Sequence, residues 1–277
     1  MNKTLLILFL STLLNAQHFT FGLYPSNTPE KIFKAFLPFT HYLTQTTGDT
    51  YELIITRDYR ELAQRLDNKT IDFAWLGSKN YIDIKQNVKD LQYITTYMEE
   101  EKFTHQITPY YRAFIVTLKK NNLYTLKMLK NRRFAFTDRL STSGYAYPNK
   151  ILKDNHINYQ NYFSKYFFLK KHDRVIEALV NDSIDAGAIS DGTYYAAVEK
   201  YGDIFHIIKQ SDKIPLDVIV GSSTIDTIHI KKLADILNTI DVNSTALKGI
   251  KEHLGWNAAG FNAHNKELYD VLQKALE

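Results

Sequence analysis

A strand–helix–strand pattern near the N-terminus decides the fold, and it occupies residues 19–56, FTFGLYPSNTPEKIFKAFLPFTHYLTQTTGDTYELIIT. Residues 19–23 predict a strand, and Pro25-Ser26-Asn27 predicts the turn that follows it. A helix is expected to begin near Thr28, with Pro29 in its first turn, and to stop at Gly48. The apolar stripe of this helix consists of Ile32, Phe36, Phe39 and Leu43. Since residues 51–56 predict a second strand, the segment indicates an α/β protein with mostly parallel strands.

The same alternation of strands and helices continues along the chain in two series. In the first series, Asp58 is expected to cap a helix, and residues 71–76 predict a strand that leads through Gly77 and Ser78 into another helix. Residues 91–97 close this series. In the second, helices begin at Gly144 and Asp173, and the chain is helical from about His229. The strands expected there are 111–118, 133–136, 166–169, 185–189, 205–208 and 217–221.

No linker rich in Pro or Ser separates the two series, which favours two lobes joined by continuous crossing strands. We place the crossings near residues 108–113 and 213–221, so the final helices pack on the first lobe. The expected fold class is α/β, with two lobes, each a mainly parallel sheet flanked by helices, and two crossing segments at the hinge. The first lobe is expected to comprise residues 17–110 and 222–277, and the second lobe residues 111–221.

Composition excludes several classes of protein. With 44% hydrophobic and 23% charged residues, the 277-residue chain is a globular protein and not a disordered one. Its net charge of +4, from 34 basic and 30 acidic residues, is spread along the chain, so a nucleic-acid-binding footprint is absent from the sequence. Zero Cys excludes disulfides, thiolate zinc sites, iron–sulfur clusters and Cys nucleophiles. The 19 Tyr and 16 Phe could line a cleft or pack a core.

The N-terminus has the pattern of an export signal. Lys3 provides a positive start, an apolar run extends from Leu5 to Leu14, and small or polar residues follow up to Ala16. A membrane span needs roughly 20 apolar residues, and this run is shorter. Residues 1–16 are therefore expected to be a signal peptide cleaved near Ala16, which places the mature protein in a bacterial periplasm. The alternative is a buried N-terminal strand or helix.

Chemistry is concentrated in the segment Asp138-Arg139-Leu140-Ser141-Thr142-Ser143-Gly144-Tyr145, which lies between a strand and a helix. If Ser141 caps the helix, its hydroxyl and those of Thr142 and Ser143 stand beside free amides at the positive end of the helix dipole. Such an arrangement suits a tetrahedral oxyanion. Gly144 would let the backbone approach a ligand closely. The simpler alternative is an ordinary Ser/Thr cap without a ligand.

From Phe21 onward, the chain resembles the phosphate, phosphite and phosphonate binding proteins of ABC importers, the PhnD-like periplasmic binding proteins. The motifs are Phe21-Gly22-Leu23-Tyr24-Pro25, Tyr59 before a helix, Ile71-Asp72-Phe73-Ala74-Trp75-Leu76-Gly77 leading to Tyr81, Ser141-Thr142-Ser143-Gly144-Tyr145 with Pro148, His172-Asp173, and Asp185-Ala186-Gly187-Ala188. The resemblance implies a monomeric, two-lobed protein of the type II-like kind, which closes on its ligand and delivers it to a membrane permease.

The resemblance also implies roles for individual residues. Ser141, Thr142 and Ser143 would hold the phosphoryl oxygens. Donors from elsewhere would be Tyr59, Tyr81 and His172, while Asp217 and, more loosely, Asp191 would contact the other end of the ligand. Each has a simpler interpretation, because the tyrosines could belong to a core, His172 could precede a helix cap at the surface, and Asp217 could be solvated. Ser78 and Lys79 replace the Pro that many relatives carry after Leu-Gly, and the segment from Ile189 to Thr193 lacks a clear match to the acid that binds a ligand amine.

Other functions are less well supported by the sequence. A catalytic reading would use Ser143 with His172 and an Asp, but no Gly-x-Ser-x-Gly motif is present. The nine His are scattered without metal-ligand spacing, so no metal or cofactor is expected. A serious alternative is a sensor that reports ligand occupancy to a membrane receptor or kinase; an exported chain without its own membrane span favours transport. The sequence does not rank phosphate, phosphite and phosphonates, and sulfate or another anion stays open.

Overall fold

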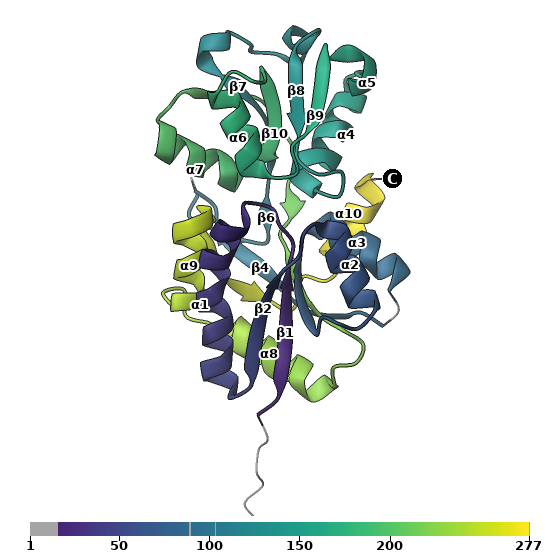
Figure 1. The fold of residues 1–277 in the computed structure, drawn as a ribbon, viewed down its shortest axis with the longest axis vertical. Coiled ribbons are helices and arrows are strands. Elements are labelled where there is room, and N and C mark those ends of the chain that lie inside the picture. The colour runs from purple at the N-terminus through teal and green to yellow at the C-terminus, as the bar shows by residue number, and fades with distance from the viewer. Residues whose placement is uncertain (1–15, 89, 103, 277) are drawn as a thin grey trace, which may run out of the picture.

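Strands and helices alternate along the chain and form two lobes, which Figure 1 shows one above the other. The computed structural model describes residues 16–88, 90–102 and 104–276. Apart from Ala16, the predicted signal peptide lies outside these residues. Within them, no helix combines the length and the apolar character needed to cross a membrane.

The first lobe begins with the predicted strand–helix–strand unit. Its N-terminal elements are β1 (His18–Leu23), α1 (Pro29–Thr47), β2 (Thr50–Ile55), α2 (Tyr59–Asp67), β3 (Phe73–Leu76), α3 (Ser78–Asn87), β4 (Gln92–Glu100) and β5 (Ile107–Thr108). Helix α1 has Pro29 in its first turn and ends at Gly48, whose φ of 78° is the left-handed conformation that glycine adopts readily. The predicted stripe of Ile32, Phe36, Phe39 and Leu43 is buried. Asp58 caps α2 by accepting a hydrogen bond from the amide of Glu61, as predicted.

The second lobe is a five-stranded sheet with helices on both faces. Its strands are β7 (Ala113–Leu118), β8 (Arg133–Phe136), β9 (Lys165–Phe168), β10 (Ala186–Ser190) and β11 (Phe205–Gln210), in the order β11-β7-β10-β8-β9. Its helices are α4 (Tyr147–Asp154), α5 (Tyr159–Tyr162), α6 (His172–Val180) and α7 (Asp191–Tyr201), with shorter turns η1 (Lys119–Asn121), η2 (Leu126–Leu129) and η3 (Thr142–Ala146). Ile115 and Phe114 belong to separate clusters because successive strand residues face opposite sides of the sheet.

Two crossing segments pair with each other at the hinge. Strand β6 (Tyr110–Tyr111) runs antiparallel to β12 (Ile214–Pro215). The chain then enters the first lobe as β13 (Val218–Gly221), which lies between β3 and β4. The remaining elements, α8 (Thr227–Asn238), α9 (Thr245–Leu254), β14 (Ala258–Asn262) and α10 (Leu268–Leu276), complete that lobe. Because β13 belongs to the first sheet, the return crossing ends before Val218, a few residues earlier than the expected boundary at 222.

Both sheets contain the expected parallel strands, and both also include antiparallel strands. In the first sheet, ordered β14-β4-β13-β3-β1-β2 with β5 beside β4, β1 is parallel to β2 and β3, whereas β13 is antiparallel to β3 and β4. In the second sheet, β8, β9 and β10 are parallel and β7 is antiparallel to β10. A strand that enters a lobe from the hinge starts at the side where the parallel strands end. It must therefore run against them.

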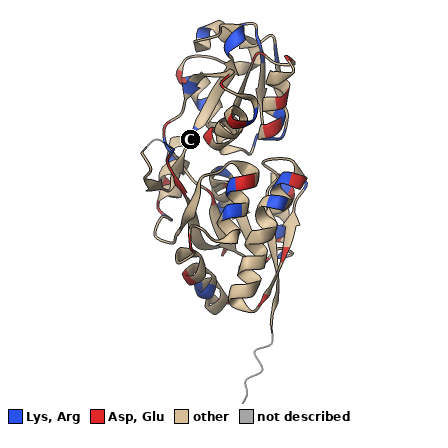
Figure 2. Cartoon of the chain, turned by 90° about the vertical axis from the view of Figure 1, so that its left-hand side faces the viewer, with Lys and Arg blue, Asp and Glu red and all other residues tan. Residues whose placement is uncertain are grey.

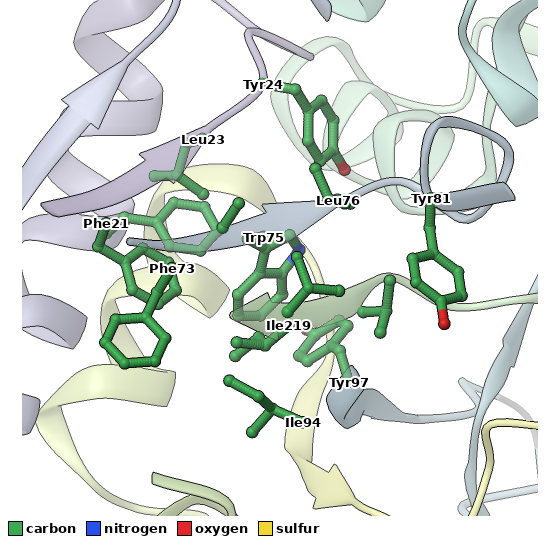
Figure 3. Packing of buried hydrophobic residues seen from close by; sticks show 14 of the residues in the cluster. Phe21, Leu23, Tyr24, Phe73, Trp75, Leu76, Tyr81, Ile94, Tyr97 and Ile219 are labelled. Atoms are coloured by element: carbon green, nitrogen blue, oxygen red, sulfur yellow. The ribbon is translucent and has the colours of Figure 1, made fainter. Parts of the chain in front are cut away.

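The centre of the first lobe is an aromatic core around Trp75, which is fully buried (Figure 3). Phe36 and Tyr97 lie 4.9 Å from Trp75, measured between ring centroids, and Ile219 of β13 is part of the same cluster. Phe21 and Phe73 extend this core along β1 and β3. The core thus fixes β3, β4 and β13 in one rigid layer whose cleft-side ends carry polar residues.

Candidate functional site

A pocket lies between the lobes, at the carboxyl ends of β1, β3, β8 and β10, where α/β sheets usually bind ligands. We call it the inner pocket; about 560 Å³ of space not occupied by atoms lies within it, including space that is open to solvent. Residues of the first lobe and hinge that line it include Tyr24, Ser26, Tyr59, Tyr97, Tyr111 and Asp217. Those of the second lobe include Ser141, Thr142, Ser143, His172, Ser190 and Asp191. Seven of the nine predicted site residues line the pocket, and several residues that the sequence analysis did not identify line it with them.

The Ser-Thr-Ser segment forms one wall of the inner pocket. Ser141, Thr142 and Ser143 are each at most 4% exposed, and all three line the pocket. Ser141 caps η3, as predicted, because its Oγ accepts a hydrogen bond of 3.1 Å from the amide of Gly144. The amides of Thr142 and Ser143 open a helical segment that continues into α4, so they have no acceptor within it. Side chains that line the pocket therefore stand beside amides that have no acceptor within the helical segment.

Gly144 has a packing role and not the predicted ligand contact. A Cβ at this position would lie 1.7 Å from Oγ1 of Thr137, and the Gly144 carbonyl accepts a hydrogen bond from the Thr137 amide. Its own amide is already bonded to Ser141, and Gly144 does not line the pocket. The glycine is needed because η3 lies directly against the end of β8.

Two helices of the first lobe donate hydrogen bonds from their N-terminal amides to side chains of the second lobe. Among the described residues, the N-cap residues of α1 and α3 make no side-chain capping hydrogen bond. Oγ1 of Thr142 accepts a 2.9 Å hydrogen bond from the amide of Lys79 and shares one of 3.2 Å with Oγ of Ser78. Oδ2 of Asp173 accepts a 3.0 Å hydrogen bond from the amide of Thr28. Ser78, where many relatives carry Pro, thus takes part in a direct contact between the lobes.

His172 lies in the inner pocket, 5% exposed, at the start of α6. Its Nδ1 accepts a 3.2 Å hydrogen bond from the amide of Ser190, and its own amide donates to the carbonyl of Ser26. Burial lowers the pKa of His172 to about 4, so the ring is neutral at physiological pH. Since Nδ1 is an acceptor, the proton is on Nε2, and His172 offers the pocket an uncharged N–H donor.

Tyr59 lines the pocket as predicted and stacks on Tyr24, with ring centroids 4.9 Å apart. The Tyr24 hydroxyl donates a hydrogen bond to Oδ2 of Asp217, which also accepts one of 2.8 Å from Nε1 of Trp75. Burial, followed by the charge of Asp217, raises the pKa of Tyr59 well above its usual range, so its hydroxyl remains a neutral donor. Asp217, also a predicted site residue, is held by the aromatic core beneath the pocket.

Tyr81 does not lie in the inner pocket. It is 1% exposed and packs edge-on against Tyr269 of α10, with 5.0 Å between ring centroids. Tyr81 is the fourth residue of α3, and its side chain projects toward α10. Figure 3 shows it apart from the pocket residue Tyr24. Tyr24, Tyr97 and Tyr111 are the tyrosines that accompany Tyr59 in the pocket.

Three carboxylates lie at the part of the pocket near the hinge, where Glu99 joins the predicted Asp191 and Asp217. Burial raises the pKa of Asp191 to about 7 and that of Asp217 to about 6. Burial, with the charges of Asp191 and Asp217, raises the pKa of Glu99 well above its usual range. Among the described residues, no Lys or Arg lines this pocket, although both kinds of charge are interspersed over the two lobes (Figure 2).

For some of the pocket residues that the sequence analysis did not identify, the sequence contains a pattern that would have indicated them; for others it does not. Tyr24 and Ser26 directly follow β1, so the rule that ligands bind at the carboxyl ends of strands would have found them. Tyr97 and Glu99 are two apart on β4 and share a face, but nothing local says that this face meets the second lobe. Trp256 comes from the loop after α9, far from the other motifs.

The geometry gives no support to a catalytic triad. The one hydrogen bond of the His172 ring in the described chain is to the backbone amide of Ser190, so no carboxylate orients it as a base. In the same residues, no group of three or more His, Asp and Glu side chains is arranged to hold a metal ion. The pocket lining offers hydroxyl and imidazole donors at one end and carboxyl groups at the other.

Comparison with known proteins supports the resemblance inferred from the sequence. A family model described as ABC transporter, phosphonate, periplasmic substrate-binding protein matches residues 21–269. The binding protein component of an ABC phosphonate transporter from Pseudomonas aeruginosa has 18% identity and a TM-score of 0.82, covering 94% of this chain and 85% of that chain. PhnD1 from Prochlorococcus marinus, solved with methylphosphonate, has 18% identity and a TM-score of 0.81, covering 93% and 96%. A Xanthomonas citri protein bound to chloride has 16% identity and a TM-score of 0.73, covering 94% and 96%.

Proposed function

The chain belongs to the family of periplasmic substrate-binding proteins of phosphonate ABC transporters, and from this premise we propose that it binds a small phosphorus oxyanion in the inner pocket and delivers it to a permease. The ligand is a phosphonate, phosphite or phosphate. In this proposal the protein is exported, is cleaved near Ala16, acts as a monomer and performs no chemistry. The two lobes hold the ligand between them.

The observation that carries this proposal is the wall formed by Ser141, Thr142 and Ser143. A phosphoryl group presents three oxygens in a tetrahedral arrangement, and each accepts hydrogen bonds. The wall offers hydroxyls together with free amides at the start of a helical segment, which favours negative charge through the helix dipole. Such a site needs no Lys or Arg, in agreement with the lining of the inner pocket.

His172 and Tyr59 supply donors from two further directions. Both are neutral at physiological pH, since burial lowers the pKa of His172 and raises that of Tyr59. Neutral donors in a water-poor pocket give hydrogen bonds to a charged acceptor worth about 1.5–3 kcal/mol each. The carboxylates near the hinge repel the phosphoryl group, so it binds at the hydroxyl wall with its substituent directed toward Asp217.

The test is a ligand screen on the protein exported by a bacterial host with its own N-terminus. Mass spectrometry should find a mature chain that begins near Gln17. Thermal shift after removal of bound ligand would compare methylphosphonate, phosphite, phosphate and sulfate. A ligand at a hundred times its dissociation constant stabilises the folded protein by about 2.7 kcal/mol, a shift of several degrees. A response to a phosphorus compound with none to sulfate supports the proposal, and a response to sulfate alone contradicts it.

Delivery to a permease is tested separately in cells. Removing the gene should abolish growth on the phosphorus compound found in the screen as the sole phosphorus source, and restoring it should restore growth. Normal uptake together with a lost transcriptional response to that compound would instead identify a sensor.

A further inference from the structure

A second space, which we call the outer cavity, adjoins the inner pocket on the hinge side. About 1270 Å³ not occupied by atoms lies within it, including space that is open to solvent, among hinge strand β6, helix α7 and the loop after α9. Among the described residues, those that line both spaces are Glu99, Tyr111, Asp191, Gly192 and Trp256. These residues form a shared wall, and the wall decides whether a ligand can extend from the inner pocket into the outer cavity.

The members of the shared wall are held in different ways. Tyr111 belongs to β6, which pairs with β12, and Glu99 belongs to β4. Asp191 and Gly192 begin α7, and both Asp191 oxygens accept hydrogen bonds of 2.8 Å from backbone amides. Trp256 is the member of this wall that lies outside the helices and strands, between α9 and β14. Its position therefore depends on the tertiary contacts of its ring.

One of these contacts closes the wall against the second lobe. A Cβ on Gly192 would lie 3.0 Å from Cδ1 of the Trp256 ring, closer than side chains normally pack. The preceding residue, Gly255, has a φ of 69°, and a Cβ there would lie 2.7 Å from Cβ of Ala196 in α7. Two positions without a side chain, one in each lobe, thus let the loop after α9 lie directly on α7. The space between Trp256 and Gly192 is too narrow for a carbon chain.

Other contacts anchor the Trp256 ring on the aromatic core of the first lobe. Its centroid lies 6.0 Å from that of Tyr97 and 6.4 Å from that of Phe36. Aromatic pairs at such distances stabilise each other beyond the burial of their area. The ring therefore moves with the first lobe, and its contact with Gly192 forms as the two lobes come together.

We propose that Trp256 determines specificity by limiting the size of the ligand's substituent. With the phosphoryl group at the hydroxyl wall, the substituent points to the hinge-side end of the inner pocket, where Trp256 and Gly192 close the way to the outer cavity. A hydrogen, hydroxyl or methyl group fits in front of this contact, whereas a longer alkyl chain or an ester group has to separate the two residues. The inference rests on the proposed function, because it takes the phosphoryl group to lie at the hydroxyl wall.

The test measures dissociation constants by titration calorimetry for phosphite, phosphate and the uncharged alkylphosphonates from methyl to butyl. For the wild-type protein, affinity should fall roughly tenfold or more between methylphosphonate and butylphosphonate, because the longer chain overpacks the site. In Trp256→Ala the chain can pass into the outer cavity. The two dissociation constants should then become about equal, mainly through tighter binding of butylphosphonate.

Two further variants separate the size of the ring from its role in packing. Trp256→Phe keeps an aromatic ring beside Tyr97 and Phe36, so it carries the test if Trp256→Ala does not fold, and its preference should lie between those of the other two proteins. Tyr195→Ala is the matched control, since Tyr195 lines the outer cavity and not the inner pocket. Removing its ring enlarges the space behind the shared wall and leaves the wall intact. Its preference for methylphosphonate should equal that of the wild-type protein.

The outcomes distinguish this inference from the proposed function. If the wild-type protein binds butylphosphonate as tightly as methylphosphonate, or if the Trp256 variants weaken both and keep their ratio, Trp256 does not limit the substituent, while phosphorus binding stands. If Tyr195→Ala changes the ratio as much as Trp256→Ala does, the shared wall does not determine specificity. If none of these phosphorus compounds binds to any of the proteins, the proposed function itself is wrong.

Discussion

At one end of the inner pocket, Ser141, Thr142 and Ser143 present neutral hydroxyls; at the other, Glu99, Asp191 and Asp217 place three carboxylates around the same space. The neutral end comes from a single turn, whereas the acidic end combines residues of β4, α7 and the segment before β13. The neutral end can bind a charged group because hydroxyls and amides donate to it without a counter-ion. At the acidic end, burial raises the pKa values of all three carboxyl groups, so protonation can remove part of their charge. The proposed dianion is therefore expected to bind at the neutral end.

The strongest test of this contrast removes the neutral end. Changing Ser141→Ala and Ser143→Ala together deletes two hydroxyl donors, each worth about 1.5–3 kcal/mol to a charged acceptor, so affinity should fall by roughly two to four orders of magnitude. Titration calorimetry with the ligand found in the screen measures the change. Ser183→Ala, at an exposed turn of the same lobe, is the control. An unchanged dissociation constant would place the phosphoryl group elsewhere.

A second test asks whether the neutral end is held in place by packing. Gly144→Ala would put a methyl group 1.7 Å from Oγ1 and 2.7 Å from Cβ of Thr137, and rotation of the Thr137 side chain relieves only the first contact. Overpacking of this kind costs about 1–3 kcal/mol, so the melting temperature should fall by several degrees. Gly77→Ala is the control, because its methyl group would have no neighbour closer than 3.9 Å. Equal melting temperatures for the two variants would contradict the packing role.

A pair of tyrosines sharpens the boundary between pocket and core. Tyr59→Phe removes a hydroxyl that lines the inner pocket and should weaken binding roughly tenfold to a hundredfold, the effect of one hydrogen bond of about 1.5–3 kcal/mol to a charged acceptor. Tyr81→Phe removes a hydroxyl that lies outside the pocket and should leave affinity unchanged. Titration calorimetry on both variants shows which of the two hydroxyls contacts the ligand. The reverse result would restore Tyr81 as a ligand donor.

The smallest effect concerns the acidic end in the ligand-stripped protein. The pKa of Asp191 is about 7 when folded, against an ordinary value of 3.8, so between these values the folded state binds a proton that the unfolded state lacks. The contribution of Asp191 to the free energy of unfolding therefore rises as pH falls from 8 toward 5. Asp217, with a pKa of about 6, acts in the same direction. Burial lowers the pKa of His172 from 6.5 to about 4, so below pH 6.5 this group reduces the free energy of unfolding as pH falls.

Melting temperatures are therefore compared between pH 8 and pH 6.5, because the effect of His172 on stability develops below this interval. The melting temperature of the wild-type protein should rise by roughly 1–3 °C relative to Asp191→Asn over this interval. Parallel curves for the two proteins would show that Asp191 has an ordinary pKa.

The sequence predicted most of what local chemistry determines. Helix α1, the caps at Asp58 and Ser141, and the two lobes all follow from turn residues, caps and hydrophobic spacing. It did not predict the antiparallel strands β7 and β13, because the direction of a strand at the hinge depends on which lobe the strand enters. The reason for Gly144 also differs from the predicted one: the glycine leaves room for Thr137, which packs against it, and not for a ligand.

The acidic end was only partly predictable for the same reason. Asp191 and Asp217 each follow or precede a strand at the cleft, where polar residues attract attention. Glu99 lies near the end of a long strand, and Trp256, which lines the same pocket, lies in a loop more than 150 residues later, so only the folded arrangement brings the two residues together. The acidic end of the inner pocket is recognised from which residues lie close together in the folded protein, and not from residue type alone.

The helix caps that cross between the lobes have a consequence for the conformational equilibrium. Helices α1 and α3 of the first lobe obtain hydrogen-bond acceptors at their N-termini from Asp173 and Thr142 of the second, and these bonds exist only while the lobes are together. The protein thus contributes part of the free energy of closure from its own backbone, which raises the closed fraction of the free protein and hence its apparent affinity. Under the proposed function, a permease that separates these two contacts would favour ligand release without touching the ligand.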